Sequence, residues 1–319
     1  MKIFIIAAAL MHLTECIHIP KTTNHNPDLK NMEIEDYKFH IRTSGNKDKK
    51  PIVVIHGGPG GDFQYLLPLE KLADEFHILF YDQRMTGLSQ RESEKKPGIE
   101  QDIEDLDRII KTFSAHQKVI LIGHSYGGML AAGYTARHSE SVASAVIIEP
   151  GILNRESAFE FIERFKSRTS IFSLFSIVPP LLKSIFVKTE DGHERYDYVM
   201  TKLLESGSGQ PYQCEGISLP KTAFVRGGFN VFNSTIRPIM NSPELFTADL
   251  TVGLEKFKGK ILLLSSECSF IGYDYQETFH RKYFPKNTQH ILLNHTGHNF
   301  ITTDTEQAIP VIREFLKKG

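Results

Sequence analysis

The sequence predicts an α/β fold, in which helices cover both faces of a mostly parallel, doubly wound sheet and a helical cap is inserted once. Short apolar runs alternate along the chain with segments in which apolar residues recur at helical spacing. This alternation stops between residues 151 and about 251 and then resumes. A Gly-x-Ser-x-Gly pentapeptide, Gly123–Gly127, lies between an apolar run and a stretch of small apolar residues, which is typical of a strand-to-helix turn.

Seven segments are predicted to be strands. Tyr37, Phe39 and Ile41 alternate with polar residues, which indicates an antiparallel strand at the edge of the sheet. The other six are runs of mostly apolar residues, as in buried parallel strands: 51–55, 76–81, 119–122, 142–148, 261–264 and 289–293. Helical spacing predicts helices around 66–74, 103–113, 129–137 and 307–317.

The 319 residues divide into five predicted segments. Residues 1–15 are expected to be a signal peptide and 16–33 a polar linker, whereas 34–150 and 251–319 form the two parts of the core. Residues 151–250 form the cap, over the carboxyl ends of the strands. Its apolar stretch 171–182 is too short and too rich in proline to span a membrane. That stretch either packs on the core or lines an apolar substrate pocket.

The N-terminus predicts export. Lys2 precedes the apolar run Ile3–Met11, which fits a secretory signal better than a transmembrane helix of about 20 residues. Cys16 follows in a context that resembles the bacterial lipoprotein box, although Glu15 departs from the small residue expected there. A signal cleaved without lipidation and a buried N-terminal helix remain alternatives. Whether Cys214 and Cys268 pair in an exported chain is left open.

Charge and composition exclude several classes of function. The formal net charge is -1, with 40% hydrophobic and 24% charged residues, so the sequence does not indicate binding to nucleic acid or to an anionic membrane surface. A membrane contact is expected only through a lipid on Cys16. No cluster of histidines and carboxylates has the spacing of a metal site, and no metal or cofactor is expected.

The Gly123–Gly127 turn predicts a serine nucleophile. A nucleophile between a strand and a helix lies in a strained turn that lifts its hydroxyl away from the sheet, where only small neighbours fit. Ser125 is therefore the predicted nucleophile. An inert serine in a glycine-rich turn is the alternative.

A serine nucleophile requires a base and donors for an oxyanion. His298 is the predicted base, because it lies between the last strand and the last helix, on the same rim of the sheet as Ser125. His295 is expected to be a surface histidine. The oxyanion hole is predicted from the N–H of Tyr126 and from Gly58, in the glycine-rich loop His56–Gly61.

Three motifs together carry a family resemblance: His56–Gly60, Asp82–Ser89 and Gly123–Gly128. In their order and spacing they resemble the α/β-hydrolase superfamily, and most of all its proline iminopeptidase branch. The resemblance implies the fold, a helical cap, and neither metal nor organic cofactor. It also implies that the Asp82–Arg84 turn shapes the loop beside the site.

The sequence departs from this branch at two points. It has no tryptophan, and no cap segment matches the branch's acidic site for a free amino terminus, although Glu190, Asp191, Glu194, Glu205 and Glu215 could supply one. The family's catalytic aspartate should follow the strand at 261–264, where the matching residue is Ser269, which cannot act as an acid.

We therefore expect the orienting acid to be Glu149. It follows the strand that comes directly after the helix of the nucleophile, so it should lie on the same rim as Ser125 and His298. Some α/β-hydrolases carry the acid on this strand. Glu267, two residues before Ser269, is the alternative acid, and Glu149 could otherwise be a buried carboxylate that ties the cap to the core.

These residues predict a metal-independent serine hydrolase that forms an acyl-serine intermediate on a small-molecule or short-peptide substrate, with an ester or an N-terminal peptide bond as the target. A non-catalytic binding protein on the same fold is the alternative. Dehalogenation is a third hypothesis, but it needs a carboxylate nucleophile and the turn carries Ser125.

Overall fold

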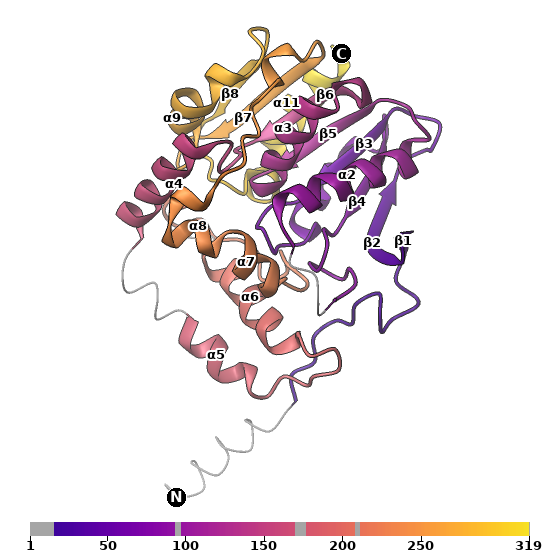
Figure 1. Cartoon of the computed structure of the whole chain (residues 1–319), viewed down its shortest axis with the longest axis vertical. Coiled ribbons are helices and arrows are strands. Elements are labelled where there is room, and N and C mark those ends of the chain that lie inside the picture. Colours follow the sequence, from indigo (N-terminus) through magenta and orange to yellow (C-terminus); the bar gives the residue numbers. More distant parts are fainter. Residues whose placement is uncertain (1–15, 93–96, 170–176, 208–210, 319) are drawn as a thin grey trace, which may run out of the picture.

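The computed structural model describes residues 16–92, 97–169, 177–207 and 211–318. The described residues form a sheet of eight strands in the order β1-β2-β4-β3-β5-β6-β7-β8. β1 and β2 are antiparallel to their neighbours, and the remaining strands are parallel. The predicted α/β architecture with a mostly parallel sheet is confirmed (Figure 1). The strands are β1 (Asn31–Ile34), β2 (Tyr37–Ser44), β3 (Pro51–Ile55), β4 (His77–Tyr81), β5 (Val119–His124), β6 (Val142–Ile148), β7 (Lys260–Ser266) and β8 (Gln289–Leu293).

The N-terminal edge of the sheet differs from the prediction. Three of the four residues of β1 lie in the segment 16–33 that was predicted to be a linker, and β1 pairs with β2 from Asn31↔His40 to Ile34↔Tyr37. The linker prediction is therefore wrong at its end, and β2 is not the edge strand. β1 alternates polar and apolar residues as β2 does, but it has only four residues, which is too short a run to identify a strand from the sequence. The predicted signal peptide, 1–15, lies outside the described residues.

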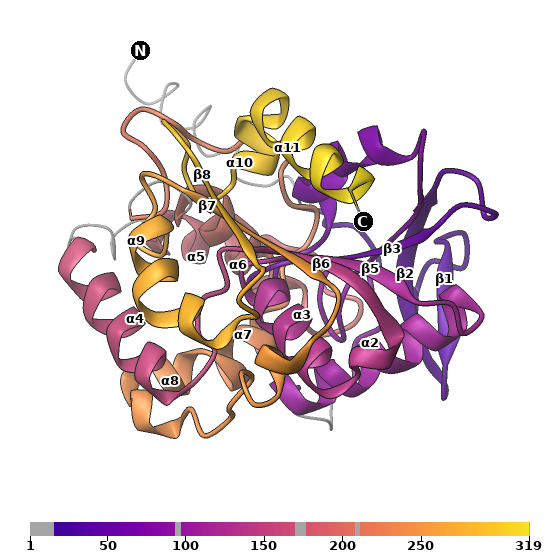
Figure 2. The same ribbon diagram turned by 90° about the horizontal axis from the view of Figure 1, so that it is seen from above.

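The core lies in two layers, one on each face of the sheet. Alternate residues of a strand point to opposite faces, so Val53 and Leu121 join one cluster, whereas Ile52 and Ile120 join the other. Helices α2 (Ile99–Ser114) and α3 (Tyr126–Arg137) cover the first face. The 3-10 helix η1 (Gln64–Leu72), α10 (Phe300–Thr303) and α11 (Thr305–Lys317) cover the second face, as Figure 2 shows for α10 and α11.

Between β6 and β7 the described residues form helices and the loops that connect them. The helices are α4 (Arg155–Arg168), α5 (Val178–Ser184), α6 (Glu194–Gly207), α7 (Phe229–Thr235) and α8 (Arg237–Asn241), followed by the short helices η4 (Pro243–Leu245) and η5 (Leu254–Lys256) (Figure 1). We call residues 151–259 the helical insertion. Short helical turns α9 (Tyr273–Tyr275), η6 (Gln276–His280) and η7 (Arg281–Tyr283) lie between β7 and β8, and η2 (Ser139–Ser141) precedes β6. Within the described residues, none of the helices combines the length and the apolar content that crossing a bilayer requires.

Candidate active site

Ser125 lies in a strained turn between β5 and α3. Its backbone has φ 55° and ψ -118°, a region that residues with a side chain rarely occupy. The Ser125 N–H donates to the carbonyl of Ile148 on β6 at 2.8 Å, which holds the turn against the neighbouring strand. A Cβ atom on Gly127 would lie 2.1 Å from the carbonyl oxygen of Ile55, so only glycine fits there. Ser125 is half-buried, whereas the residues on either side are buried, as expected for a serine raised above the sheet.

His298 lies in the loop between β8 and α10, and two contacts fix its position. The backbone N–H of His298 donates to the carbonyl of Tyr212 in the helical insertion at 2.7 Å. The centroid of the Tyr212 ring lies 5.0 Å from the centroid of the imidazole. Its Nδ1 lies 2.5 Å from Oε2 of Glu149. Because a carboxylate oxygen only accepts hydrogen bonds, Nδ1 carries the proton, and Nε2 of the neutral ring is left as an acceptor.

Glu149 is the first residue after β6 and is fully buried, with 0% exposure. Its other oxygen, Oε1, accepts from the N–H and from the hydroxyl of Ser266, each at 2.5 Å. A buried carboxylate is costly unless its oxygens are satisfied, and three donors satisfy this one. The structure therefore brings the predicted acid Glu149 into contact with the predicted base His298.

Glu267 occupies a different environment. It accepts from the backbone N–H of His295 at 2.6 Å and lies 3.5 Å from the Nδ1 of that residue. The side chain of His295 is 93% exposed, so His295 is the surface residue that the sequence suggested. Ser269, at the family's acid position, accepts from the N–H of Ile271 through its hydroxyl at 3.2 Å.

The glycine-rich loop after β3 lies directly beside Ser125. A Cβ atom on Gly57 would lie 2.8 Å from Cβ of Ser125, so the loop passes within van der Waals distance of the elbow. Gly58 is exposed and has φ 133°, which residues with a side chain rarely adopt. Tyr126 is the first residue of α3, where backbone N–H groups have no partner within the helix. Gly58, on the glycine-rich loop, and Tyr126, at the start of α3, are the predicted oxyanion donors and thus lie on two segments next to Ser125.

A buried chain of hydrogen bonds connects these loops, and it was missed in the sequence. The Gly57 N–H donates to the hydroxyl of Tyr65 at 2.7 Å, and this hydroxyl lies 2.7 Å from Nδ1 of His124. Nε2 of His124 lies 2.9 Å from the carbonyl of His298. Since a carbonyl only accepts, Nε2 of His124 carries the proton and Nδ1 accepts from Tyr65. We call Gly57, Tyr65, His124 and His298 the loop-linking chain.

His124 is held neutral in this chain. Burial lowers the pKa of His124 well below its usual value, and the neighbouring His298 lowers it further. The two rings lie 4.4 Å apart between centroids. A histidine at the variable position before Ser125, together with a tyrosine after the glycine-rich loop, is the sequence signal that could have revealed the chain.

Asp62 attaches the glycine-rich loop to the helical insertion. Its carboxylate accepts from the N–H groups of Val225 at 2.6 Å and Arg226 at 3.0 Å, and also from Gln64 at 2.9 Å. The Gly228 N–H donates to the carbonyl of Gly60 at 2.8 Å. Burial raises the pKa of Asp62 to about 7, and nearby Asp82 adds to the rise.

The Asp82–Arg84 turn packs beneath this loop. Asp82 accepts from the N–H groups of Phe63 at 3.1 Å and Leu88 at 2.8 Å, and Arg84 forms a two-pronged ion pair with Asp105. These contacts fit the structural role implied by the family resemblance.

Four of the five acidic residues that could have formed a site for a free amino terminus, all but Glu215, are engaged with basic side chains or backbone groups. Arg226, which is 1% exposed, binds both Asp191 and Asp197. Oε1 of Glu194 accepts from the N–H groups of Glu190 and Asp191, each at 2.6 Å. Glu190 also pairs with Lys21 and Lys188, Glu205 pairs with Lys202, and Glu215 is exposed.

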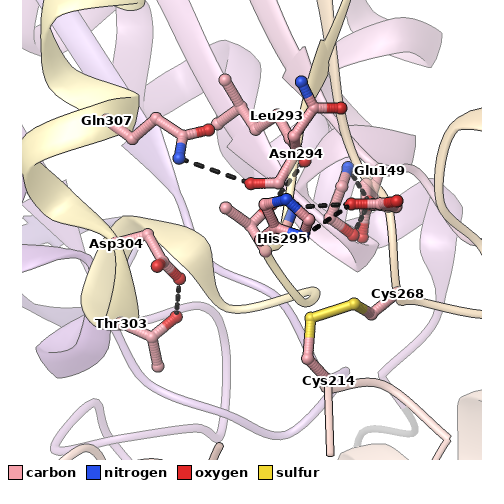
Figure 3. The surroundings of a disulfide bond; sticks show 12 residues. Glu149, Cys214, Cys268, Leu293, Asn294, His295, Thr303, Asp304 and Gln307 are labelled. Carbon is pink, nitrogen blue, oxygen red and sulfur yellow. Dashed lines mark hydrogen bonds and ion pairs between the residues drawn. A yellow bond between two sulfur atoms is a disulfide. The ribbon is translucent and has the colours of Figure 1, made fainter.

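Cys214 and Cys268 form a disulfide, with Cα atoms 5.0 Å apart. The bond joins the helical insertion to the loop after β7, as Figure 3 shows beside the loop that carries Asn294 and His295. Nearby, the Cys268 N–H donates to the carbonyl of Thr296 at 3.0 Å. The disulfide therefore fastens together two segments that contact the His298 loop.

Among the described residues, no group of three or more histidine, cysteine or acidic side chains is placed to hold a metal ion.

Part of the chain matches a known family model, and the chain is similar in sequence to known proteins. Residues 50–172 match the family model described as the alpha/beta hydrolase fold. The chain is 33% identical over 113 residues to a proline iminopeptidase of Saccharolobus solfataricus, a match that covers 35% of this chain and only 36% of that protein. It is 25% identical over 296 residues to the proline iminopeptidase PfmaB of Pestalotiopsis fici, covering 90% and 99% of the two chains.

Solved structures share the fold at low sequence identity. The crystal structure of VinJ superposes with a TM-score of 0.64 at 18% identity, covering 91% of this chain and 98% of that one. The fold, the family match and the sequence relatives agree with the three motifs quoted above. The chain has the α/β-hydrolase fold over the residues that match the family model, and the two relatives named above are proline iminopeptidases.

Proposed function

We propose that the protein is a serine hydrolase that cleaves an ester or an N-terminal peptide or amide bond through an acyl-serine intermediate. The observation that carries this proposal is the contact between Nδ1 of His298 and the buried Glu149, on the rim where Ser125 occupies its strained turn. A carboxylate, an imidazole and a serine in this order form the arrangement that serine hydrolases use.

The proposed reaction follows from the protonation states. Nε2 of His298 accepts the hydroxyl proton as Oγ of Ser125 bonds to the carbonyl carbon, and the N–H groups of Gly58 and Tyr126 stabilise the resulting oxyanion. The C–O or C–N bond then breaks, and the imidazolium returns its proton to the leaving alcohol or amine. Water, deprotonated by His298, attacks the acyl-serine and releases the acid. Glu149 keeps the proton on Nδ1 and stabilises the imidazolium.

An apolar groove lies next to the helix that follows Ser125. A groove between α3 and the helical insertion is lined mainly by apolar side chains, among them Tyr126, Met129, Ile236, Ile239 and Phe246. Tyr126 and Met129 lie on the first turn of the helix that begins after Ser125. Neither Ser125 nor His298 lines this groove, so we infer that it takes an apolar part of a small-molecule or short-peptide substrate that extends beyond the reacting bond.

A fluorophosphonate probe tests the proposal. Ser125 should be labelled covalently, and Ser125→Ala should lose both labelling and turnover while keeping its fold by circular dichroism. Ser125→Cys is a control that keeps a nucleophile of similar size. An unlabelled wild-type protein that still binds ligands would favour the non-catalytic binding protein instead.

We also propose that the protein is exported, either lipidated at Cys16 or cleaved without lipid. The Cys214–Cys268 disulfide supports this location, since such bonds persist mainly in oxidising compartments. Mass spectrometry of the protein from separated cell fractions tests it. A chain that begins near Cys16, with or without acyl groups, is expected, and an intact Met1 on a cytosolic protein would contradict export.

A further inference from the structure

Helix α5 exposes its apolar side to solvent. Val178, Leu181, Leu182 and Ile185 lie at the i, i+3, i+4 and i+7 positions that define one face of a helix. Such a face normally packs on the core, but here Leu181, Leu182 and Ile185 are 52%, 59% and 62% exposed. Ile177 and Phe186 extend the exposed surface at its two ends. We call Ile177, Val178, Leu181, Leu182, Ile185 and Phe186 the α5 face.

The α5 face is unusual within this molecule. More than half of the large apolar side chains that are exposed in the described part of the chain lie in this one stretch. Isolated exposed apolar residues are common, but a contiguous group on one helix marks an interaction surface. The stretch from Ile177 to Phe186 contains no acidic residue and one basic residue, Lys183, which is exposed.

The N-terminal chain reaches the molecule at this same place. The Ile17 N–H donates to the carbonyl of Phe186 at 2.9 Å, and the Lys188 N–H donates to the carbonyl of Ile17 at 3.0 Å. Ile17 and Ile19 pack against a small cluster of Val187, Tyr198 and Val199. Figure 1 shows the first described residues beside α5, at the end of the molecule opposite the C-terminus. Cys16, with a free and exposed thiol, is thereby held next to the α5 face.

We propose that the α5 face docks on the surface of a lipid bilayer. The residues before Ile17 include the apolar run Ile3–Met11 and Cys16, so an uncleaved apolar run or a lipid on Cys16 would enter the bilayer next to this face. A lipid chain or a short apolar segment alone gives reversible attachment, and stable attachment needs a second contact. The α5 face supplies apolar surface at that position, and Lys183 without an acidic neighbour in the stretch suits anionic headgroups.

This proposal does not depend on the proposed chemistry. Docking is measured without turnover and can be carried out on the Ser125→Ala variant. Failure of the serine-hydrolase proposal would therefore leave docking untouched, and the reverse also holds.

Vesicle sedimentation with the full-length protein tests the proposal. The probes are vesicles of phosphatidylethanolamine and phosphatidylglycerol, and vesicles of phosphatidylcholine. Leu182→Asn/Ile185→Asn should lower the bound fraction at limiting lipid by about tenfold or more, because two apolar side chains lose their burial in the bilayer. The loss should also appear in a Cys16→Ser background, where no lipid can be attached. Phosphatidylcholine vesicles should bind more weakly than the anionic vesicles.

A matched control replaces apolar residues elsewhere on the surface. Phe159 and Val252 are 43% and 69% exposed, so Phe159→Asn/Val252→Asn removes comparable apolar surface outside the α5 face. This variant should bind vesicles as the parent does. Equal binding by both double variants, or no binding by the parent, would overturn the proposal.

Two other occupants give distinct results, and each would overturn the proposal. If a second copy of the chain covers the α5 face, Leu182→Asn/Ile185→Asn should convert a dimer to a monomer in gel filtration without changing vesicle binding. If the chain before Cys16 covers it, the same variant should lower the melting temperature and leave vesicle binding unchanged.

Discussion

The ends of β6 and β7 look alike in sequence and differ in their surroundings. Each strand is followed at once by a glutamate, Glu149 after β6 and Glu267 after β7, and the two strands pair in parallel up to Ile148↔Leu264. Glu149 is fully buried against His298, whereas the side chain of Glu267 is 48% exposed beside His295. A carboxylate at the end of a neighbouring strand is thus not sufficient for contact with His298, because the turn that follows decides where the side chain points.

The turn after β6 directs Glu149 inward. Glu149 has φ 41°, which few residues with a side chain adopt, and this conformation aims its carboxylate at donors on the neighbouring strand end. The last residue of β7, Ser266, provides those donors with its N–H and its hydroxyl, and the chain then reaches the disulfide at Cys268. We infer that the β7 end, where the family carries its acid, here supports a carboxylate supplied by β6.

The largest expected effect separates the two glutamates. Glu149→Gln should lower kcat by about 10⁴-fold, since the neutral amide neither stabilises the imidazolium nor enforces the same tautomer. Glu267→Gln should stay within about tenfold of wild type, because its partner His295 is a surface residue. Steady-state kinetics on any ester that the enzyme turns over measures both. The reverse ranking would assign the acid to Glu267.

Removal of the disulfide tests whether the loop after β7 contributes to stability and not directly to activity. Cys214→Ser/Cys268→Ser should lower the free energy of unfolding by about 2–4 kcal/mol, as expected for a closed loop of this size. Activity of the folded fraction should fall by less than about tenfold, since the described residues show no hydrogen bond from either cysteine to His298 or Glu149. Denaturant unfolding under oxidising conditions, with and without reductant, gives the first value. A reductant effect on the double variant equal to that on wild type would show that the disulfide is not its origin.

A smaller effect is expected where the two strand ends meet. Ser266→Ala removes one of the two donors to Oε1 of Glu149 and keeps the backbone N–H. A hydrogen bond to a charged group contributes about 1.5–3 kcal/mol, so kcat should fall by roughly tenfold or more and the variant should be less stable. Ser265→Ala, on the adjacent residue, is the control. If both variants behave alike, Ser266 does not support Glu149.

The smallest effect concerns a carboxylate away from both strand ends. Asp102 accepts from the hydroxyl of Tyr126 at 2.6 Å, and burial raises its pKa to about 7. A carboxyl whose pKa is higher in the folded state contributes stability below its unfolded pKa of about 4, and this contribution is lost as the pH rises to about 7. Asp102→Asn lacks that loss. The free energy of unfolding of the variant, measured relative to wild type, should therefore rise by on the order of 1 kcal/mol or more between pH 5 and pH 8.

Urea unfolding at both pH values measures this difference. Glu104→Gln, a substitution of a neighbouring exposed carboxylate, is the control. Its free energy of unfolding should differ from that of wild type by the same amount at both pH values. A constant difference for Asp102→Asn would mean that its carboxyl is not protonated near neutral pH in the folded protein.

Local sequence patterns predicted most of the fold. The apolar runs located β3 to β8 because each buried parallel strand carries its own signal. The helix expected around 66–74 is instead the 3-10 helix η1, with Pro68 inside, since proline cannot donate within an α-helix. β1 was missed because its four residues depend on pairing with β2.

The candidate site was predictable only where a motif or the order of the strands fixed it. The motifs identified Ser125 and the glycine-rich loop, and strand order suggested Glu149, which the structure places against His298. Their catalytic roles remain predictions. The Cys214–Cys268 bond and the contacts of Tyr65 and His124 depend on segments far apart in the chain. Such contacts follow from packing and leave no periodic pattern in the sequence.

The loop-linking chain couples the residue choice at position 65 to the residue choice at position 124. Each hydrogen bond in it has a fixed direction, and both of its ends are backbone groups, the N–H of Gly57 and the carbonyl of His298, which every residue but proline supplies at position 57 and every residue supplies at position 298. Only a side chain that accepts at one end and donates at the other fits at position 124, and its acceptor needs the hydroxyl at position 65. In a library randomised at both positions, active members should therefore retain tyrosine and histidine together. Members in which only one of the two residues is exchanged should be inactive. Any active member that lacks one of them should also carry a compensating change at the other position.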